Sequence, residues 1–195
     1  MSDLESAAKA TLSGIIRDGA PVSLLSRGVE SLAAFAFKCA VVADHMSPNG
    51  APFFSPHVRH RFREHLEIPD GIRMWIAAFQ GISRASGRFN SYYVLPNDKH
   101  VGEFDFFVFT YAAGHLAIQV VAPRWKRLHL HKRELPRVIA DSLWDAAAVE
   151  FWPTPGLPLA WPPSHYLDDE TFRAFTDRFS RTMRVGLAVT DRATH

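Results

Sequence analysis

The chain has 195 residues, enough for one domain with its own hydrophobic core, or for one domain and a small appendage. Its 47% hydrophobic and 22% charged residues exclude an intrinsically disordered protein, and a net charge of +2 is too small to indicate a nucleic-acid-binding protein by itself. The single cysteine, Cys39, excludes an internal disulfide and a multi-cysteine zinc site within this chain.

The sequence shows no signal peptide and no membrane span. The first twenty residues carry Asp3, Glu5 and Asp18 where a signal peptide needs an apolar segment. The longest apolar stretch, Leu32 to Ala43, is interrupted by Lys38 and is too short to cross a bilayer. We therefore expect a cytoplasmic protein of bacterial type.

Three helices are predicted in the first third of the chain. Residues 3–16 and residues 27–46 each repeat apolar side chains at helical spacing. The third helix is predicted over residues 56–66, because Ser55 is a preferred N-cap and Pro56 suits the first helical turn. The helical part is therefore expected to occupy residues 1–66.

The pattern then changes to β-strands separated by Gly, Asn and Pro. An antiparallel sheet of about four to five strands is expected within residues 72–131, with strands at 73–80, 87–95, 103–111, 115–121 and a shorter one at 127–131. The strands at 103–111 and 115–121 are expected to form a hairpin with its turn centred on Ala113. In that register Asp105 and His115 lie about 20 Å apart, so they cannot form an acid–base pair.

The end of the chain is expected to close the domain. Residues 136–165 contain two Trp-Pro segments and too much proline for a helix or a central strand, so we expect them to lie extended over the surface, pinned by Trp152 and Trp161. Asp168 is expected to cap a closing helix over residues 168–183. The whole pattern predicts a single α+β domain over residues 1–195, with N-terminal helices packed on the sheet.

Histidine pairs offer only weak metal-ligand candidates. His57 and His60 share a face of the third predicted helix, and His129 and His131 project from the same side of a predicted strand. A zinc site needs a third protein ligand, and neither pair has one nearby in the sequence. The chain also lacks the glycine-rich phosphate loops and the strained nucleophile turn of known enzyme classes. No cofactor is assigned.

A basic segment, RWKRLHLHKR at residues 124–133, offers candidate contacts to a nucleic-acid backbone and one stacked base. The same composition is also typical of an edge strand that charge protects from aggregation. The candidate contact residues are Arg124, Trp125, Lys126, Arg127, Lys132 and Arg133.

Two N-terminal segments carry a family resemblance. MSDLESAAKATLSGII at 1–16, followed by SLAAFAFKCAVVADHMSPNGAPFF at 31–54, resembles an uncharacterised bacterial family related to HNH endonucleases. GIRMWIAAFQG at 71–81, AAGHLAIQVV at 112–121 and the paired Trp-Pro segments are similar to that family's β-region and tail. The likeness extends over nearly the whole chain as loose patterns, and MSDLE is its most specific phrase.

The resemblance also implies what this chain lacks. In that family a zinc-binding module with CxxC pairs and a histidine comes first, and Met1 here stands at the Met of the family's C-N-x-G-W-M-S-x-L-E phrase. The zinc ligands and the HNH histidine would then lie upstream, removed either by a start codon assigned too late or by natural loss of the module. No catalytic or metal-binding family residue carries over, so we expect no HNH-type cleavage by these residues.

Three hypotheses follow for function. The first is a non-catalytic accessory domain of an HNH-associated protein that contacts nucleic acid or a protein partner. The second is a small-molecule-binding domain or enzyme with a pocket between the sheet and the helices. The third is a structural or oligomerisation domain. In the second hypothesis His129 and His131 supply polar or metal-binding groups, and the pocket is lined by Trp75, Tyr92, Phe107 and Tyr111.

Overall fold

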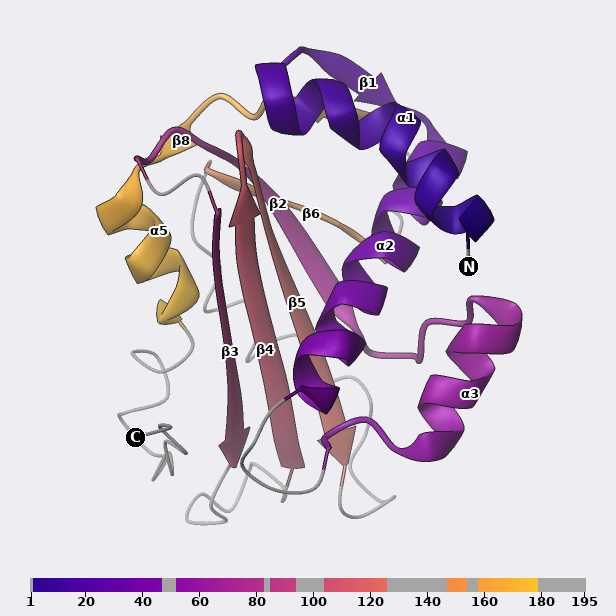
Figure 1. Cartoon of the computed structure of the whole chain (residues 1–195). Helices are drawn as coiled ribbons and strands as arrows, with labels where there is room; N and C mark the ends of the chain where they lie inside the picture. The colour runs from indigo at the N-terminus through magenta and orange to yellow at the C-terminus, as the bar shows by residue number, and fades with distance from the viewer. Residues whose placement is uncertain are drawn as a thin grey trace.

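The computed structural model of the chain describes residues 2–46, 52–82, 85–93, 104–125, 147–153 and 158–178. Within these ranges it is an α+β fold, as predicted (Figure 1). The helices are α1 (Ser2–Asp18), α2 (Ser26–His45), α3 (Pro56–His65) and α5 (Asp169–Thr176). The strands are β1 (Val22–Leu24), β2 (Arg73–Phe79), β3 (Ala85–Tyr93), β4 (Phe104–Ala113), β5 (Leu116–Trp125), β6 (Ala148–Trp152), β7 (Leu159–Trp161) and β8 (Tyr166–Leu167).

The main sheet has the order β3-β4-β5-β2-β6, and β8 pairs with the end of β2 that β6 leaves open. All of these pairings are antiparallel except that of β8 with β2. The helical part is less uniform than predicted, because β1 interrupts it and pairs with β7 in a separate two-stranded sheet. Local periodicity could not reveal β1, since its partner lies more than a hundred residues away in the chain.

The predicted hairpin forms with a different register. Ala113 pairs with Leu116, so the turn consists of Gly114 and His115 and is not centred on Ala113. Gly114 has a φ of +56°, a conformation that residues with a Cβ rarely adopt. Asp105 pairs with Arg124 at the far end of the hairpin from His115, so the two residues still cannot act together.

The expectation for residues 136–165 is wrong in part. Residues 148–152 form β6, which pairs with β2, and residues 159–161 form β7. Both strands contribute to the core, because Phe151 is fully buried and Trp161 is only 3% exposed. Prolines are tolerated here since they follow the strands, at Pro153 and Pro162, and β6 is an edge strand.

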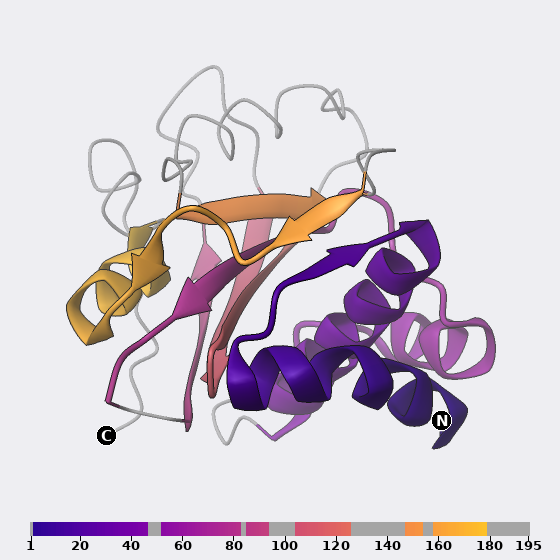
Figure 2. The ribbon, with the colours of Figure 1, turned by 90° about the horizontal axis from the view of Figure 1, so that it is seen from above.

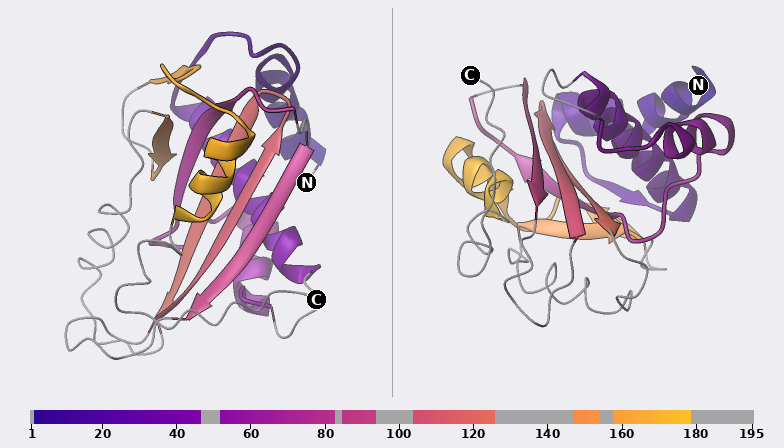
Figure 3. Two further views of the ribbon diagram at one scale, coloured as in Figure 1. Left: turned by 90° about the vertical axis from the view of Figure 1, so that its left-hand side faces the viewer. Right: turned by 90° about the horizontal axis from the view of Figure 1, so that it is seen from below.

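The main sheet separates two layers of helix. Helices α1, α2 and α3 lie on one face and α5 lies on the other, as Figures 2 and 3 show. Alternate residues of β2 serve the two layers. Met74 and Ile76 belong to the large core shared with α2, whereas Phe79 contacts Phe172 of α5 with ring centroids 5.3 Å apart.

Residues 127–131 and 179–183, predicted to be a strand and the end of the closing helix, lie outside the described residues. The start of the closing helix is as predicted. Asp168 is the N-cap of α5, and its side chain accepts a hydrogen bond from the backbone N–H of Thr171 at 2.8 Å. In the part of the chain that the structure describes, no helix combines the length and apolar character needed to span a bilayer.

Candidate site: an apolar pocket beside helix α3

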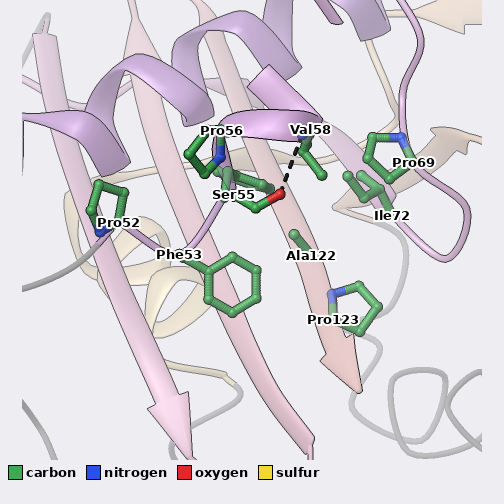
Figure 4. A pocket seen from close by; sticks show the side chains of 10 residues that line it. Pro52, Phe53, Ser55, Pro56, Val58, Pro69, Ile72, Ala122 and Pro123 are labelled. Carbon is green, nitrogen blue, oxygen red and sulfur yellow. Dashed lines mark hydrogen bonds between the residues drawn. The ribbon is translucent and has the colours of Figure 1, made fainter. Parts of the chain in front are cut away.

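An open pocket of about 420 Å³ lies where α3 meets the end of β5 (Figure 4). We call it the α3 pocket. Three stretches far apart in the sequence build it: the segment before and within the first turn of α3, the turn before β2, and the end of β5. Its lining residues are Pro52, Phe53, Phe54, Ser55, Pro56, Val58, Pro69, Ile72, Ala122 and Pro123.

A buried carboxylate holds one wall of the α3 pocket. Asp44, near the end of α2, is 4% exposed and accepts hydrogen bonds from the backbone N–H groups of Phe53 and Phe54 at 2.8 and 2.9 Å. These bonds compensate for burial of the carboxylate and fix the approach to α3. The wall is therefore held by polar bonds beneath an apolar surface.

Aromatic packing supports the same wall from below. The Phe53 ring stacks on Phe107 of β4 with centroids 5.7 Å apart, and Phe54 meets Phe37 of α2 edge to face at 5.2 Å. Phe37 in turn contacts Phe62 of α3 at 4.9 Å. Such contacts couple the pocket to the main core, so the pocket is present before anything binds.

The first turn of α3 forms the opposite wall. Ser55 caps the helix, as predicted, because its Oγ accepts a hydrogen bond from the backbone N–H of Val58 at 3.3 Å. Figure 4 shows Val58 and Pro69 on one side of the α3 pocket and Phe53 and Pro123 on the other. The only polar side chain in the lining, Ser55, is already used by the helix, so the pocket offers a ligand mainly apolar contact.

Helix α3, whose first turn lines the pocket, is rich in basic residues. Helix α3 carries three arginines and three histidines against one glutamate. Two of the arginines form exposed ion pairs, Arg61 with Glu67 and Arg63 with Glu64, and such pairs are worth little in water. Directly after the pocket residue Pro123, residues 124–133 contain five Lys and Arg and no acidic residue.

The structure does not bring the predicted pocket residues together. Phe107 and Tyr111 face the α2 side of the sheet, whereas Trp75 faces α5. Phe107 is 1% exposed and lies beneath Phe53, and burial raises the pKa of Tyr111. The backbone of Tyr92, in β3, pairs with that of Phe106 in β4. The α3 pocket does lie between the sheet and a helix, but other residues line it.

The predicted nucleic-acid contacts are only partly within the described residues. Arg124 and Trp125 end β5, where their backbones pair with Asp105 and Phe104. The remaining contact candidates, Lys126, Arg127, Lys132 and Arg133, lie outside the described residues, as do the metal-ligand candidates His129 and His131. His57 and His60 are both exposed on α3, and no group of three or more potential metal ligands occurs among the residues with described positions.

Sequence reasoning missed a buried polar cluster beneath α5. Gln119 is fully buried on β5 and donates through Nε2 to the Thr110 hydroxyl at 2.8 Å and to the Phe175 carbonyl at 3.1 Å. Since α5 ends at Thr176, the Phe175 carbonyl is one of the terminal acceptors that a helix leaves unsatisfied. Gln119 thus attaches the end of α5 to the sheet. In the sequence, a single glutamine within the apolar run HLAIQVV at residues 115–121 indicates a buried polar contact.

An arginine completes the buried cluster beneath α5. The Arg178 guanidinium is 3% exposed and lies 4.6 Å from the ring centroids of both Trp75 and Phe175. Burial lowers the pKa of Arg178 to about 9, and the Glu150 carboxylate opposes that effect, so the group remains a cation at neutral pH. Glu150 itself forms a two-pronged ion pair with Arg73. This cluster fastens α5 to the sheet.

Comparison with known protein families, with curated proteins and with solved structures finds no match to this chain. The geometry of the site is therefore what points to a function.

Proposed function

We propose that this chain is a non-catalytic accessory domain that binds a protein partner, and that the partner inserts one apolar side chain, with acidic residues beside it, into the α3 pocket. The open, preformed apolar pocket is the observation that carries the proposal. In the setting that the family resemblance implies, the domain would recruit a partner to an HNH-associated protein.

The walls of the α3 pocket support an apolar anchor. Phe53, Val58, Ile72 and the prolines present carbon atoms, and the Ser55 hydroxyl is engaged by α3. Transfer of a Leu or Phe side chain from water into such a site is worth about 1.5–3 kcal/mol. Because Asp44 and the phenylalanine stacks already hold the wall in place, little of that gain is lost to ordering the pocket.

Basic residues in the segments that adjoin the pocket-lining residues along the chain support acidic neighbours for that anchor. The whole chain has a net charge of only +2, yet α3 and residues 124–133 together hold eight Lys and Arg and one Glu. A partner with carboxylates beside its anchor therefore gains attraction at the rim, which raises the association rate.

A nucleic acid fits these observations less well than a protein segment does. The basic residues suit phosphates, but a base in the α3 pocket would find a single side-chain hydroxyl there, that of Ser55, for the several donors and acceptors of its edge. We therefore place the apolar side chain of a protein in the pocket and treat nucleic-acid binding as a competing outcome.

The test selects peptides from a random displayed library on the whole chain and measures their affinity by fluorescence anisotropy. We expect peptides with a Leu, Phe or Trp flanked by Asp or Glu. Val58→Glu puts a charge in the pocket wall and should weaken binding about tenfold or more. His57→Glu makes a similar charge change at the adjacent exposed position and should weaken binding by no more than about threefold.

Two results would overturn the proposal. Equal weakening by Val58→Glu and His57→Glu would show that charge alone drives binding and that the α3 pocket is not used. Tight binding of a single-stranded oligonucleotide, with affinity falling steeply with salt and unaffected by the selected peptides, would favour the nucleic-acid hypothesis.

A further inference from the structure

Helix α1 and helix α2 form a second apolar depression, which shares no residue with the α3 pocket. It has a volume of about 370 Å³, and we call it the α1–α2 slot. Its lining residues are Lys9, Leu12, Ser13, Ile16 and Arg17 of α1 and Phe35 of α2. The α1 members are spaced by three, one, three and one residues, so they form a single stripe along the helix.

The floor of the α1–α2 slot is apolar. Leu12 is 3% exposed, and Ile16 and Phe35 are half-buried against the core. The Ser13 hydroxyl donates to the Lys9 carbonyl within α1 at 2.6 Å, which turns its polar atom back into the helix. The slot therefore offers a straight strip of carbon surface on which another helix can lie.

A cation stands at each end of this strip. Lys9 and Arg17 are both exposed, and their positions eight residues apart on one helix separate them by about 12 Å along its axis. Arg17 is paired with Asp18 at 2.9 Å, but those side chains are 78% and 51% exposed, so a carboxylate of a partner can replace Asp18 at small cost.

The same charges argue against a second copy of this chain as the occupant. Two copies of the stripe packed antiparallel about a two-fold axis at Ser13 would bring Lys9 of one copy against Arg17 of the other. Like charges in that position repel, and the Asp18 carboxylate that pairs with Arg17 would have to serve both cations. The complementary occupant has negative charge where this stripe has positive charge.

We infer that the α1–α2 slot binds an amphipathic helix of another protein, with apolar residues on Leu12, Ile16 and Phe35 and two acidic residues about eight positions apart that meet Lys9 and Arg17. This mode is the packing of a helix into a groove, in which apolar residues three and four apart give affinity and the end charges set register.

The test uses a synthetic helical peptide with leucines on one face, between two glutamates eight positions apart, and a companion with lysines in place of the glutamates. Fluorescence anisotropy on the whole chain should show saturable binding of the glutamate peptide. The double variant Lys9→Glu with Arg17→Glu should lose about tenfold or more in affinity for it. That variant should gain affinity for the lysine peptide by a similar factor.

A matched pair of substitutions tests the apolar floor. Ile16→Asp should abolish binding of the glutamate peptide, whereas Ile82→Asp, the same change at a residue that is 92% exposed and lies outside the slot, should leave it unchanged. Circular dichroism checks that each variant is folded. If Ile16→Asp unfolds, the test depends on the double variant Lys9→Glu with Arg17→Glu, whose substitutions are at exposed positions. Val58→Glu in the α3 pocket should have no effect, which separates this inference from the proposed function.

Three outcomes would overturn the inference. These are no saturable binding of the glutamate peptide, equal affinity of the wild-type chain for both peptides, and a dimer in light scattering that Ile16→Asp dissociates. The last would identify a second copy as the occupant.

Discussion

Leu66 ends helix α3 in a left-handed backbone conformation that is unfavourable for leucine. It follows α3 with φ 54° and ψ 27°, and its backbone N–H donates to the Phe62 carbonyl at 2.8 Å. Among the described residues it is the only one other than glycine with a positive φ. The left-handed conformation costs a residue with a Cβ about 1–2 kcal/mol, which glycine avoids.

We predict that Leu66→Gly is more stable than Leu66→Ala by about 1 kcal/mol, because both remove the side chain but only glycine removes the penalty at this φ. Urea denaturation monitored by circular dichroism gives the difference. Equal stability of the two variants would contradict the assignment of strain to this position.

Among the elements, helix α5 is held in place by hydrogen bonds at both of its ends. Its start is a capping box of Asp168 and Thr171, and its end is held to the sheet by Gln119. Between them, Phe172 and Phe175 bury the apolar face. The Thr171 hydroxyl and then its backbone N–H lower the pKa of Asp168, since both stabilise the carboxylate.

We predict that Asp168→Ala weakens α5 at neutral pH, whereas Asp168→Asn largely keeps the cap. Because the pKa of Asp168 is lowered by folding, its contribution is present above the ordinary value of 3.8 and is lost as the pH falls through the folded value. Hydrogen exchange of the α5 amides, measured at neutral and acidic pH, checks this. In Asp168→Asn the capping side chain does not titrate, so acidification should not weaken the cap or expose the α5 amides to faster exchange through it. Unchanged exchange in Asp168→Ala would contradict the role of the cap.

At the scale of the whole molecule, the β4–β5 turn joins the sheet to α1. The backbone N–H of His115 donates to the Ile16 carbonyl at 3.0 Å. A Cβ on Gly114 would lie 1.9 Å from that same carbonyl oxygen, so only glycine allows the turn to approach the helix. The α1–α2 slot lies on this helix, and its shape therefore depends on the hairpin.

We predict that Gly114→Ala lowers the free energy of unfolding by roughly 3 kcal/mol, through a clash with backbone and an unfavourable positive φ. Gly28→Ala is the control. Gly28 lies in α2, an added Cβ there meets Leu24 at an ordinary 3.5 Å, and alanine favours helix by about 1 kcal/mol. Chemical denaturation should thus move the two variants in opposite directions. A neutral Gly114→Ala would refute close docking of the turn on α1.

The α+β class and the starts of several elements can be predicted from the sequence without the structure. Ser55 and Pro56 mark α3, Asp168 marks α5, and runs of β-favouring residues bounded by Gly, Asn and Pro mark β2, β4 and β5. These signals can be read because each depends on a few neighbouring residues: a cap on the next backbone N–H groups, and a strand on the composition of its own run.

Which distant residues come into contact is seen only in the folded chain. The fold places Trp75 and Phe107 on opposite faces of the sheet, brings β6 against β2, and builds the α3 pocket from segments that are adjacent in space but not in sequence. The physical reason is that pairing and packing between distant segments depend on how all of them bury apolar surface together. No local pattern in one segment records its partner in another.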